Sequence, residues 1–305
     1  MDDDEPVPYM RRTREWYLAL GYDNPYRYAH FIDVPFTPLA KPVSQSTVTL
    51  LTTAAPYQPD KGPQGPGASY NAAAKFYSPY LIDTSRDHDL RISHVAIDRK
   101  HTSMEDSNAW FPLPLMRKRV MDGRIGKLTP HFHGVPTNRS QRHTLEVDAP
   151  LIVQRCKDEA VDAAVLVPNC PVCHQAMALV ARALEAAGIA TVVMGCAKDI
   201  IEHAGVPRFL FSDFPLGNAA GKPNDQLSQD ATLELALRLL ESAPAPRTTV
   251  QSPQRWDDSP AWKQDYCNVG KVSAQDLARL RGEAEQARIT ARGIRQSEFA
   301  NEHPQ

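Results

Sequence analysis

Short apolar runs alternate with longer amphipathic stretches through the second half of the chain. Apolar runs of strand length fall at 163–168, 189–194 and 207–211. Ala, Leu and Val recur at helical spacing over 171–187, and a short helical pattern covers 198–204. Strands that alternate with helices across short connections predict a parallel sheet with helices on both faces.

The first half of the chain shows weaker periodicity. Residues 46–54 predict a strand, and the alternation over 90–98 predicts a second one. Helical patterns cover 111–123 and 148–159, and a strong amphipathic helix at 231–242 is expected to close the domain. The fold class expected is therefore α/β, with Rossmann-like or flavodoxin-like layers.

Three segments are expected along the chain. An N-terminal extension (1–45) rich in tyrosine precedes an α/β catalytic domain (46–245), which could consist of two similar lobes (46–147 and 148–245). A polar helical tail (246–305) follows. The prolines and glycines at 56–67 predict a long irregular loop, and loops of this kind in compact domains often serve function.

The composition excludes several classes of protein. The chain of 305 residues is 42% hydrophobic and has a formal net charge of −2, which argues against a nucleic-acid or anionic-membrane surface. The start, Met-Asp-Asp-Asp-Glu, lacks the basic and apolar stretches of a signal peptide. Five cysteines do not suggest a secreted disulfide framework, so a cytoplasmic location is expected.

The candidate chemistry centres on the stretch Asn169-Cys170-Pro171-Val172-Cys173, between a predicted strand and a predicted helix. Pro171 suits the first helical position, which makes Cys170 the N-cap residue, with its sulfur facing free N–H groups. The positive end of the helix dipole there favours a thiolate. We interpret Cys170 as a nucleophile and Cys173, one turn on, as its resolving thiol.

A metal is the alternative for the same two sulfurs. A structural zinc site usually needs four nitrogen or sulfur ligands, and the chain has only this one Cys-x-x-Cys pair. His131 and His133 lie at alternate positions, so in an extended segment their imidazoles would point to one side. With Cys170 and Cys173 they form a candidate zinc set; two ordinary loop histidines are an equally good interpretation. No other cofactor is expected.

Two histidines are candidates for proton transfer. His94 lies within the predicted strand at 90–98, and His101 follows it in a segment rich in acidic side chains. A single histidine in a strand is more often a core residue with its hydrogen bonds satisfied. Sequence reasoning therefore favours His101 over His94.

Other candidates follow the predicted strands at the same edge of the sheet. Cys196, Asp213 and Asn218 come after strand ends, and Asn169 precedes the first cysteine. Because ligands bind outside the carboxyl ends of parallel strands, these four are expected to line a substrate pocket. No Gly-x-Gly-x-x-Gly follows any of these strands, so a dinucleotide site is not indicated.

Several stretches together resemble the selenoprotein B family of the glycine, sarcosine and betaine reductases and its D-proline reductase relatives. The resemblance covers about residues 46–242, and its most specific parts are the Cys-x-x-Cys junction and Asp213-Phe214-Pro215-Leu216-Gly217. Further similarity lies at 93–98, 105–108, 111–113 and 123–126.

The resemblance implies that Cys170 stands where the family carries selenocysteine, which attacks a substrate carbon and releases an amine. It implies a resolving role for Cys173, and a partner subunit that activates the substrate through a pyruvoyl group. Sulfur is a weaker nucleophile and a poorer leaving group than selenium, so the substrates of this chain are expected to differ, including ones that lose sulfur from carbon.

The function expected is therefore thiol-dependent cleavage of a C–N or C–S bond in a small, carboxylated substrate. Two alternatives remain: a zinc-assisted desulfurase with Cys and His ligands, and a redox-carrier subunit of a reductase complex. The expected partners are the small substrate and a thiol reductant or complex subunit. The aromatic extension and charged tail suggest a homodimer.

Overall fold

The computed structural model describes residues 5–22, 26–66, 68, 70–92 and 94–302. Its centre is an eight-stranded sheet in the order β10-β9-β8-β7-β1-β6-β3, in which β5 also pairs with β1. The strand pairs are parallel except β3 with β6. The strands are β1 (Thr47–Thr52), β3 (Tyr80–Asp83), β5 (Lys127–Leu128), β6 (His131–Gly134), β7 (Ala163–Val167), β8 (Ala190–Gly195), β9 (Arg208–Phe211) and β10 (Thr248–Gln251).

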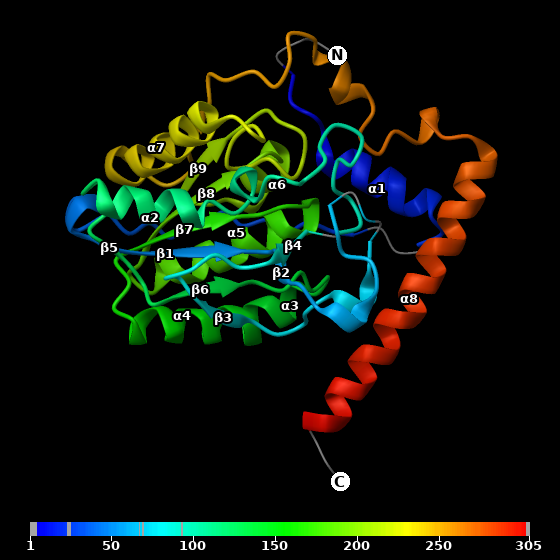
Figure 1. Ribbon diagram of the computed structural model, residues 1–305, viewed down its shortest axis with the longest axis horizontal. Helices are drawn as coiled ribbons and strands as arrows, with labels where there is room; N and C mark the ends of the chain where they lie inside the picture. The colour runs from blue at the N-terminus through cyan, green and yellow to red at the C-terminus, as the bar shows by residue number, and fades with distance from the viewer. Residues whose placement is uncertain (1–4, 23–25, 67, 69, 93, 303–305) are drawn as a thin grey trace.

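Helices cover both faces of this sheet (Figure 1). One face packs against α4 (Ala149–Asp158), α5 (Pro171–Ala186) and α6 (Lys198–Ala204). The other packs against α2 (Leu113–Met121) and α7 (Gln226–Ser242). The sequence prediction of an α/β fold with a parallel sheet is confirmed.

The central strands are apolar along their whole length because both of their faces are covered. Every residue of β7, Ala-Ala-Val-Leu-Val, is buried. Alternate positions contribute to two separate cores: Leu166 and Ala164 pack on the side of α4 and α5, while Val165 and Val167 pack on the side of α7. This pattern is typical of parallel strands between two helical layers.

The prediction of a strand at 90–98 is largely wrong. Only β4 (Leu90–Arg91) forms, and it pairs antiparallel with the equally short β2 (Ala55–Pro56). Without a longer partner, residues 94–104 leave the extended conformation and run as turns over the end of the main sheet. His94 therefore lies in a loop rather than in a strand, and residue 93 is outside the described part of the chain.

The strand order changes direction between β1 and β7. The chain adds β6 and β3 on one side of β1, and β8, β9 and β10 beyond β7 on the other. Such a switch point leaves a crevice at the carboxyl ends of the two strands, where α/β proteins bind their ligands. Thr53 follows β1 and Asn169 follows β7, so the Cys-x-x-Cys begins at this crevice.

The terminal segments pack on this carboxyl edge. The helix α1 (Tyr9–Ala19) contacts α5 and α6, and α8 (Ala274–Glu302) runs along one side of the molecule next to α1 (Figure 1). Arg281 of α8 donates to the carbonyl of Ala19. The segment after residue 245, expected to be polar and helical, also supplies β10.

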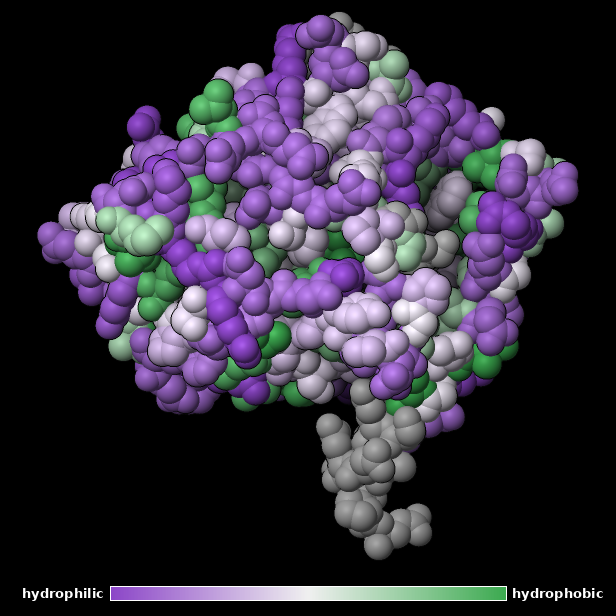
Figure 2. Space-filling view, viewed as in Figure 1, coloured by the Kyte–Doolittle hydropathy of each residue, from purple (hydrophilic) through white to green (hydrophobic). Residues whose placement is uncertain are grey.

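The visible face of the molecule is mainly hydrophilic, with apolar residues in scattered positions (Figure 2). The most exposed large apolar side chains, Ile32, Met121 and Leu227, come from separate elements. None of the described helices combines the length and the apolar character needed to cross a membrane.

Candidate active site

The strand-to-helix junction has the geometry that the sequence predicts. Cys170 has an extended backbone (φ −136°, ψ 171°) and is the N-cap of α5, with Pro171 at the first helical position. Its Sγ accepts a hydrogen bond from the backbone N–H of Cys173 at 3.2 Å. The cysteine sulfur thus does for this helix what a serine or aspartate oxygen does at other N-caps.

His94 joins the two cysteines. One ring nitrogen of His94 and the sulfurs of Cys170 and Cys173 all lie within 4.8 Å of one another. The Nε2–H of His94 donates to the carbonyl oxygen of Thr53 at 3.0 Å, which leaves Nδ1 with a free lone pair. The histidine that sequence reasoning ranked second is therefore the one that lies beside the sulfurs.

Thr53 and Asn169 form the floor of this group, and sequence reasoning missed Thr53. The backbone N–H and the side-chain amide of Asn169 both donate to Thr53 Oγ1 at 3.2 Å. Asn169 Oδ1 is buried and has no hydrogen-bond partner in the described part of the chain. The placement of Thr53 follows from β1 and β7 being neighbours, which the sequence does not state.

The two sulfurs have different electrostatic environments. Burial raises the pKa of Cys170 well above its usual value, and the adjacent Cys173 raises it further. Burial acts in the same direction on Cys173, but hydrogen bonds with Cys170, His94 and Thr53 hold its pKa well below the usual value. The pair therefore favours a Cys170 thiol that donates to a Cys173 thiolate, and the thiolate that the helix dipole predicted for Cys170 is a wrong assignment, because burial outweighs the dipole.

His174, the residue after Cys173, is fully buried. Its Nδ1–H donates to the carbonyl oxygen of Cys170 at 2.7 Å. Its Nε2 accepts from the backbone N–H groups of Cys196 at 3.0 Å and Ala197 at 3.2 Å. The imidazole thus connects the first turn of α5 to the end of β8.

Gly195 makes room for this imidazole. A Cβ at position 195 would lie 2.8 Å from His174 Nε2. Contacts that short do not occur in folded proteins, so any other residue there would displace the ring. The pairing of a buried histidine with a glycine one strand away has no signature in the sequence.

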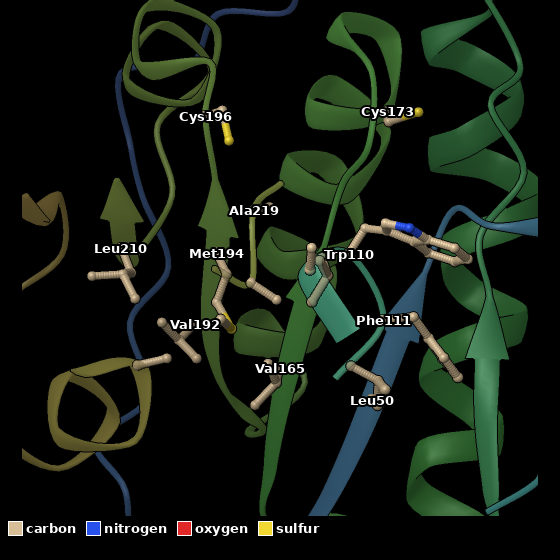
Figure 3. Close-up of a cluster of buried hydrophobic side chains, with 14 of the residues drawn as sticks. Leu50, Trp110, Phe111, Val165, Cys173, Val192, Met194, Cys196, Leu210 and Ala219 are labelled. Carbon is tan, nitrogen blue, oxygen red and sulfur yellow. The ribbon is translucent and has the colours of Figure 1, made fainter. Parts of the chain in front are cut away.

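The expected pocket residues lie at the same edge of the sheet. Figure 3 shows Cys196 after the end of β8 and Cys173 on α5, apart from each other but both beyond the apolar side chains of the core. Cys196 is buried, and Asn218 donates to the carbonyl of Pro215 and accepts from Thr102 Oγ1. Asp213 forms an ion pair with Lys263 at 2.5 Å. Contact of these residues with a substrate stays a prediction.

His101 lies in a separate ionic cluster. Its Nδ1 contacts Asp98 at 2.9 Å and its Nε2 approaches Asp265 at 3.3 Å. The Asp265 carboxylate also binds Lys100 and Lys271, which lower its pKa to about 2. This arrangement anchors the C-terminal segment, and His101 does not join the group of His94 and the two sulfurs.

His131 and His133 do not meet the Cys-x-x-Cys either. They lie on β6, on the other side of β1 from β7. Both point to one side, as expected, but that side faces α4: His131 Nδ1 is hydrogen-bonded to Glu159 Oε1 at 2.6 Å, and His133 Nε2 lies 3.6 Å from Cys156 Sγ. The metal set that the sequence suggested is not assembled.

The cysteines are almost fully enclosed: Cys170 is 5% exposed and Cys173 is 0% exposed. The N-terminal extension supplies part of the cover, since Gln175 of α5 accepts from the N–H of Ala29 at 2.6 Å and donates to the Tyr26 hydroxyl. A hollow of about 740 Å³ lies between α1 and α6, and the two cysteines do not line it.

Comparison with known proteins gives relatives of one kind. The chain is 28% identical over 223 residues to the D-proline reductase subunit gamma of Acetoanaerobium sticklandii, an alignment that covers 72% of this chain and 89% of that subunit. It is 25% identical over 226 residues to the glycine reductase complex component B subunit gamma of Carboxydothermus hydrogenoformans. The chain is a homologue of these selenoprotein B-like reductase subunits. The resemblance inferred from its motifs is thereby confirmed.

The chain matches only part of its glycine reductase relatives. It spans about half of the component B subunits, with 49% covered in Carboxydothermus hydrogenoformans and 48% in Symbiobacterium thermophilum. The match to the second of these is 25% identical over 209 residues. No family profile matches the chain, and no solved structure matches it.

Proposed function

We propose that this chain is a thiol-dependent reductase that cleaves a C–N or C–S bond of a small carboxylated substrate. The observation that carries the proposal is the meeting of Cys170, Cys173 and His94 within 4.8 Å at the switch point of the sheet. Two sulfurs in reach of each other can store the two electrons of a reductive cleavage as a disulfide.

The reaction balances with these groups alone and one external reductant. The Cys173 thiolate takes the proton of Cys170, and Cys170 attacks the substrate carbon. The C–N or C–S bond breaks, and the leaving amine or thiol takes a proton. Cys173 then attacks the Cys170 sulfur, a disulfide forms, and the substrate carbon leaves with an electron pair and takes up a proton. A dithiol reductant restores both cysteines. His94 handles the protons, and free N–H groups at the start of α5 stabilise developing negative charge.

Two cations near Cys170 suit a carboxylated substrate. Arg99 directs its guanidinium at the backbone oxygens of Ala68, Val95 and His94, and no carboxylate partner for it occurs in the described part of the chain. Lys75 lowers the pKa of Cys170, although burial and Cys173 outweigh it. A substrate carboxylate near Cys170 would interact favourably with both positive charges.

The test compares cysteine variants with glycine, D-proline and their sulfur-containing analogues as substrates and dithiothreitol as reductant. Cys170→Ser should abolish release of amine or sulfide, because no attacking thiol remains. Cys173→Ser should leave a covalent adduct on Cys170, which intact-protein mass spectrometry detects. Cys267→Ser, which removes a cysteine outside the site, is the control and should retain activity. Full turnover in Cys170→Ser would overturn the proposal.

A redox-carrier subunit is the second candidate, and the names of the relatives favour it. They are subunits of multi-component reductases. In this case the isolated chain would cycle between dithiol and disulfide without turnover and would co-purify with a partner. Turnover by the isolated chain would exclude this candidate. We further propose a cytoplasmic location, where the dithiol stays reduced, and a homodimer. A zinc-assisted desulfurase would require ligands other than His131 and His133.

A further inference from the structure

Three side chains that favour soft metals converge on one point of the fold. Sγ of Cys170, Sγ of Cys173 and one ring nitrogen of His94 lie within 4.8 Å of one another. They come from two segments, the start of α5 and the loop after β4, that are about 75 residues apart in the chain. We infer that Cys170, Cys173 and His94 form a three-ligand site for a soft divalent metal such as Zn²⁺.

The hydrogen bond of His94 prepares it to be a ligand. A metal-bound histidine almost always donates its second ring N–H to a carbonyl or carboxylate, which sets the tautomer and the ring orientation. The Nε2–H of His94 donates in this way to the Thr53 carbonyl at 3.0 Å. The remaining nitrogen, Nδ1, is then the one with a lone pair for a metal.

The spacing needs only a small adjustment. Two thiolates on tetrahedral zinc, with Zn–S bonds of about 2.3 Å, lie about 3.8 Å apart. Ligand atoms within 4.8 Å of one another would therefore move by about 1 Å or less. Cys170 precedes the first turn of α5, where a change of side-chain rotamer gives that movement without unwinding the helix.

Three protein ligands leave the fourth position of a tetrahedral metal open. Two cysteines and one histidine with an open position form the ligand set of some catalytic zinc sites. The side-chain N–H of Asn169 donates to Thr53 Oγ1, and the buried Asn169 Oδ1, which lacks a hydrogen-bond partner in the described residues, can accept from a bound water. Thiolate ligands select zinc and similar ions over magnesium or calcium.

A filled site and an attacking thiol exclude each other. Metal binding displaces the thiol protons to solvent and places both sulfurs in coordinate bonds. Cys170 then cannot attack carbon, and Cys173 cannot resolve. The inference rests on the geometry of the three ligands and not on the proposed reaction, so each can fail without the other.

The experiment titrates the reduced full-length chain with Zn²⁺ alone in competition with a chromogenic chelator, and repeats it with Co²⁺ to detect thiolate ligation by absorption. We expect one ion per chain. Cys170→Ser and Cys173→Ser should each abolish the thiolate–cobalt band, and His94→Ala should weaken Zn²⁺ binding by at least about tenfold. His131→Ala is the matched histidine control and should bind as the wild type does. Circular dichroism checks that each variant is folded.

A second measurement separates the outcomes. Bound Zn²⁺ should protect Cys170 and Cys173 from alkylation by iodoacetamide, and a chelator should restore alkylation. Equal Zn²⁺ affinity in wild type and folded His94→Ala would overturn the inference, as would the absence of binding to the reduced wild type. Rapid alkylation of Cys170 without metal binding would leave the proposed reaction standing and remove the metal site. Turnover that survives Cys170→Ser, with intact Zn²⁺ binding to the wild type, would remove the proposed reaction and leave the metal site standing.

Discussion

A single buried imidazole determines how the first cysteine is held. His174 donates to the Cys170 carbonyl and accepts from two N–H groups at the end of β8, so it bonds on both sides at once. Such a pattern requires a neutral ring, and burial lowers the pKa of His174 to about 4. His174 is a positioning residue. It orients the peptide that carries Cys170, and in the described part of the chain its ring makes no hydrogen bond to either sulfur.

Two substitutions of His174 should separate the effects of its hydrogen bonds to Cys170 and to the end of β8. In His174→Asn the amide can still donate to the Cys170 carbonyl, whereas in His174→Gln the amide oxygen can still accept near β8. If the bond to Cys170 sets its orientation, alkylation of Cys170 should slow by about tenfold in His174→Gln and much less in His174→Asn, as the loss of one buried hydrogen bond implies.

The measurement is the alkylation rate of Cys170 at constant pH, with equilibrium unfolding recorded in parallel. Equal slowing in both variants would indicate a structural role only. The variants also report on turnover, where a positioning role should lower kcat more than it changes KM.

The sequence identified Cys170 and Cys173 because the chemistry of an N-cap is local: a strand pattern, a proline and a helix pattern suffice. It ranked His94 below His101 because a histidine within a predicted strand is more often a core residue, and nothing in the sequence showed that β1 and β7 are neighbours. Thr53 and His94 meet the sulfurs only through that strand order. Contacts between distant segments are what the local pattern does not encode.

At the scale of elements, β6 and α4 enclose a histidine that is kept neutral. Burial lowers the pKa of His133 to about 4, and the neighbouring Arg155 and His131 act in the same direction. The ring lies beside Cys156 of α4, where burial raises the pKa of the thiol to about 12. Both groups are thus uncharged at neutral pH, which suits their place between sheet and helix.

This histidine should make the fold sensitive to acid. The pKa of His133 is lower in the folded chain than in the unfolded one, so between pH 6.5 and 4 the unfolded chain binds more protons. Its contribution to stability is present above pH 6.5 and is lost as the pH falls toward 4. The loss can reach about 3 kcal/mol.

Urea unfolding at pH 7 and pH 4.5 tests this. His133→Gln should show a smaller drop in the free energy of unfolding between the two pH values than the wild type shows. His174 has the same sign of dependence, so part of the drop should remain. His143→Gln, which replaces a histidine with a side chain 46% exposed, is the control. Equal drops in wild type and His133→Gln would contradict the assignment.

The elements that the sequence predicted well are those with both a strong period and buried surroundings. The alternation from β7 to β9 is found within a few residues of its expected bounds. The strands β3, β6 and β10 were missed because they are short, and two of them, β3 and β10, lie at the edges of the sheet. The prediction of a strand at 90–98 was wrong for the opposite reason. The alternation was present, but the only pairing formed there is the two-residue one between β4 and β2 in the described part of the chain.

At the scale of the whole molecule, the terminal segments close the reactive centre. The N-terminal extension docks on α5 through Gln175, one turn beyond the cysteines, and α8 in turn packs on the end of α1. The tyrosine-rich extension packs on the α/β domain. These segments lie outside the part of the chain that resembles the family.

Loosening this cover should expose Cys170. Gln175→Ala removes two hydrogen bonds between α5 and the extension, with Ala29 and with Tyr26. Each is worth about 1 kcal/mol, so the fraction of open molecules should rise by up to about thirtyfold. The alkylation rate of Cys170 should rise with it. Gln154→Ala, on the exposed side of α4, is the matched control; an unchanged rate in Gln175→Ala would show that substrate enters by another route.

The close approach at Gly195 makes two distant positions depend on each other. Because a methyl group there would collide with His174 Nε2 at 2.8 Å, Gly195→Ala should move the ring and disturb Cys170, although residue 195 touches neither sulfur. Once a smaller residue replaces His174, alanine at 195 costs little more, so the effects of the two substitutions should not add. A reactive cysteine in this fold therefore restricts the routes by which the neighbouring strand can change.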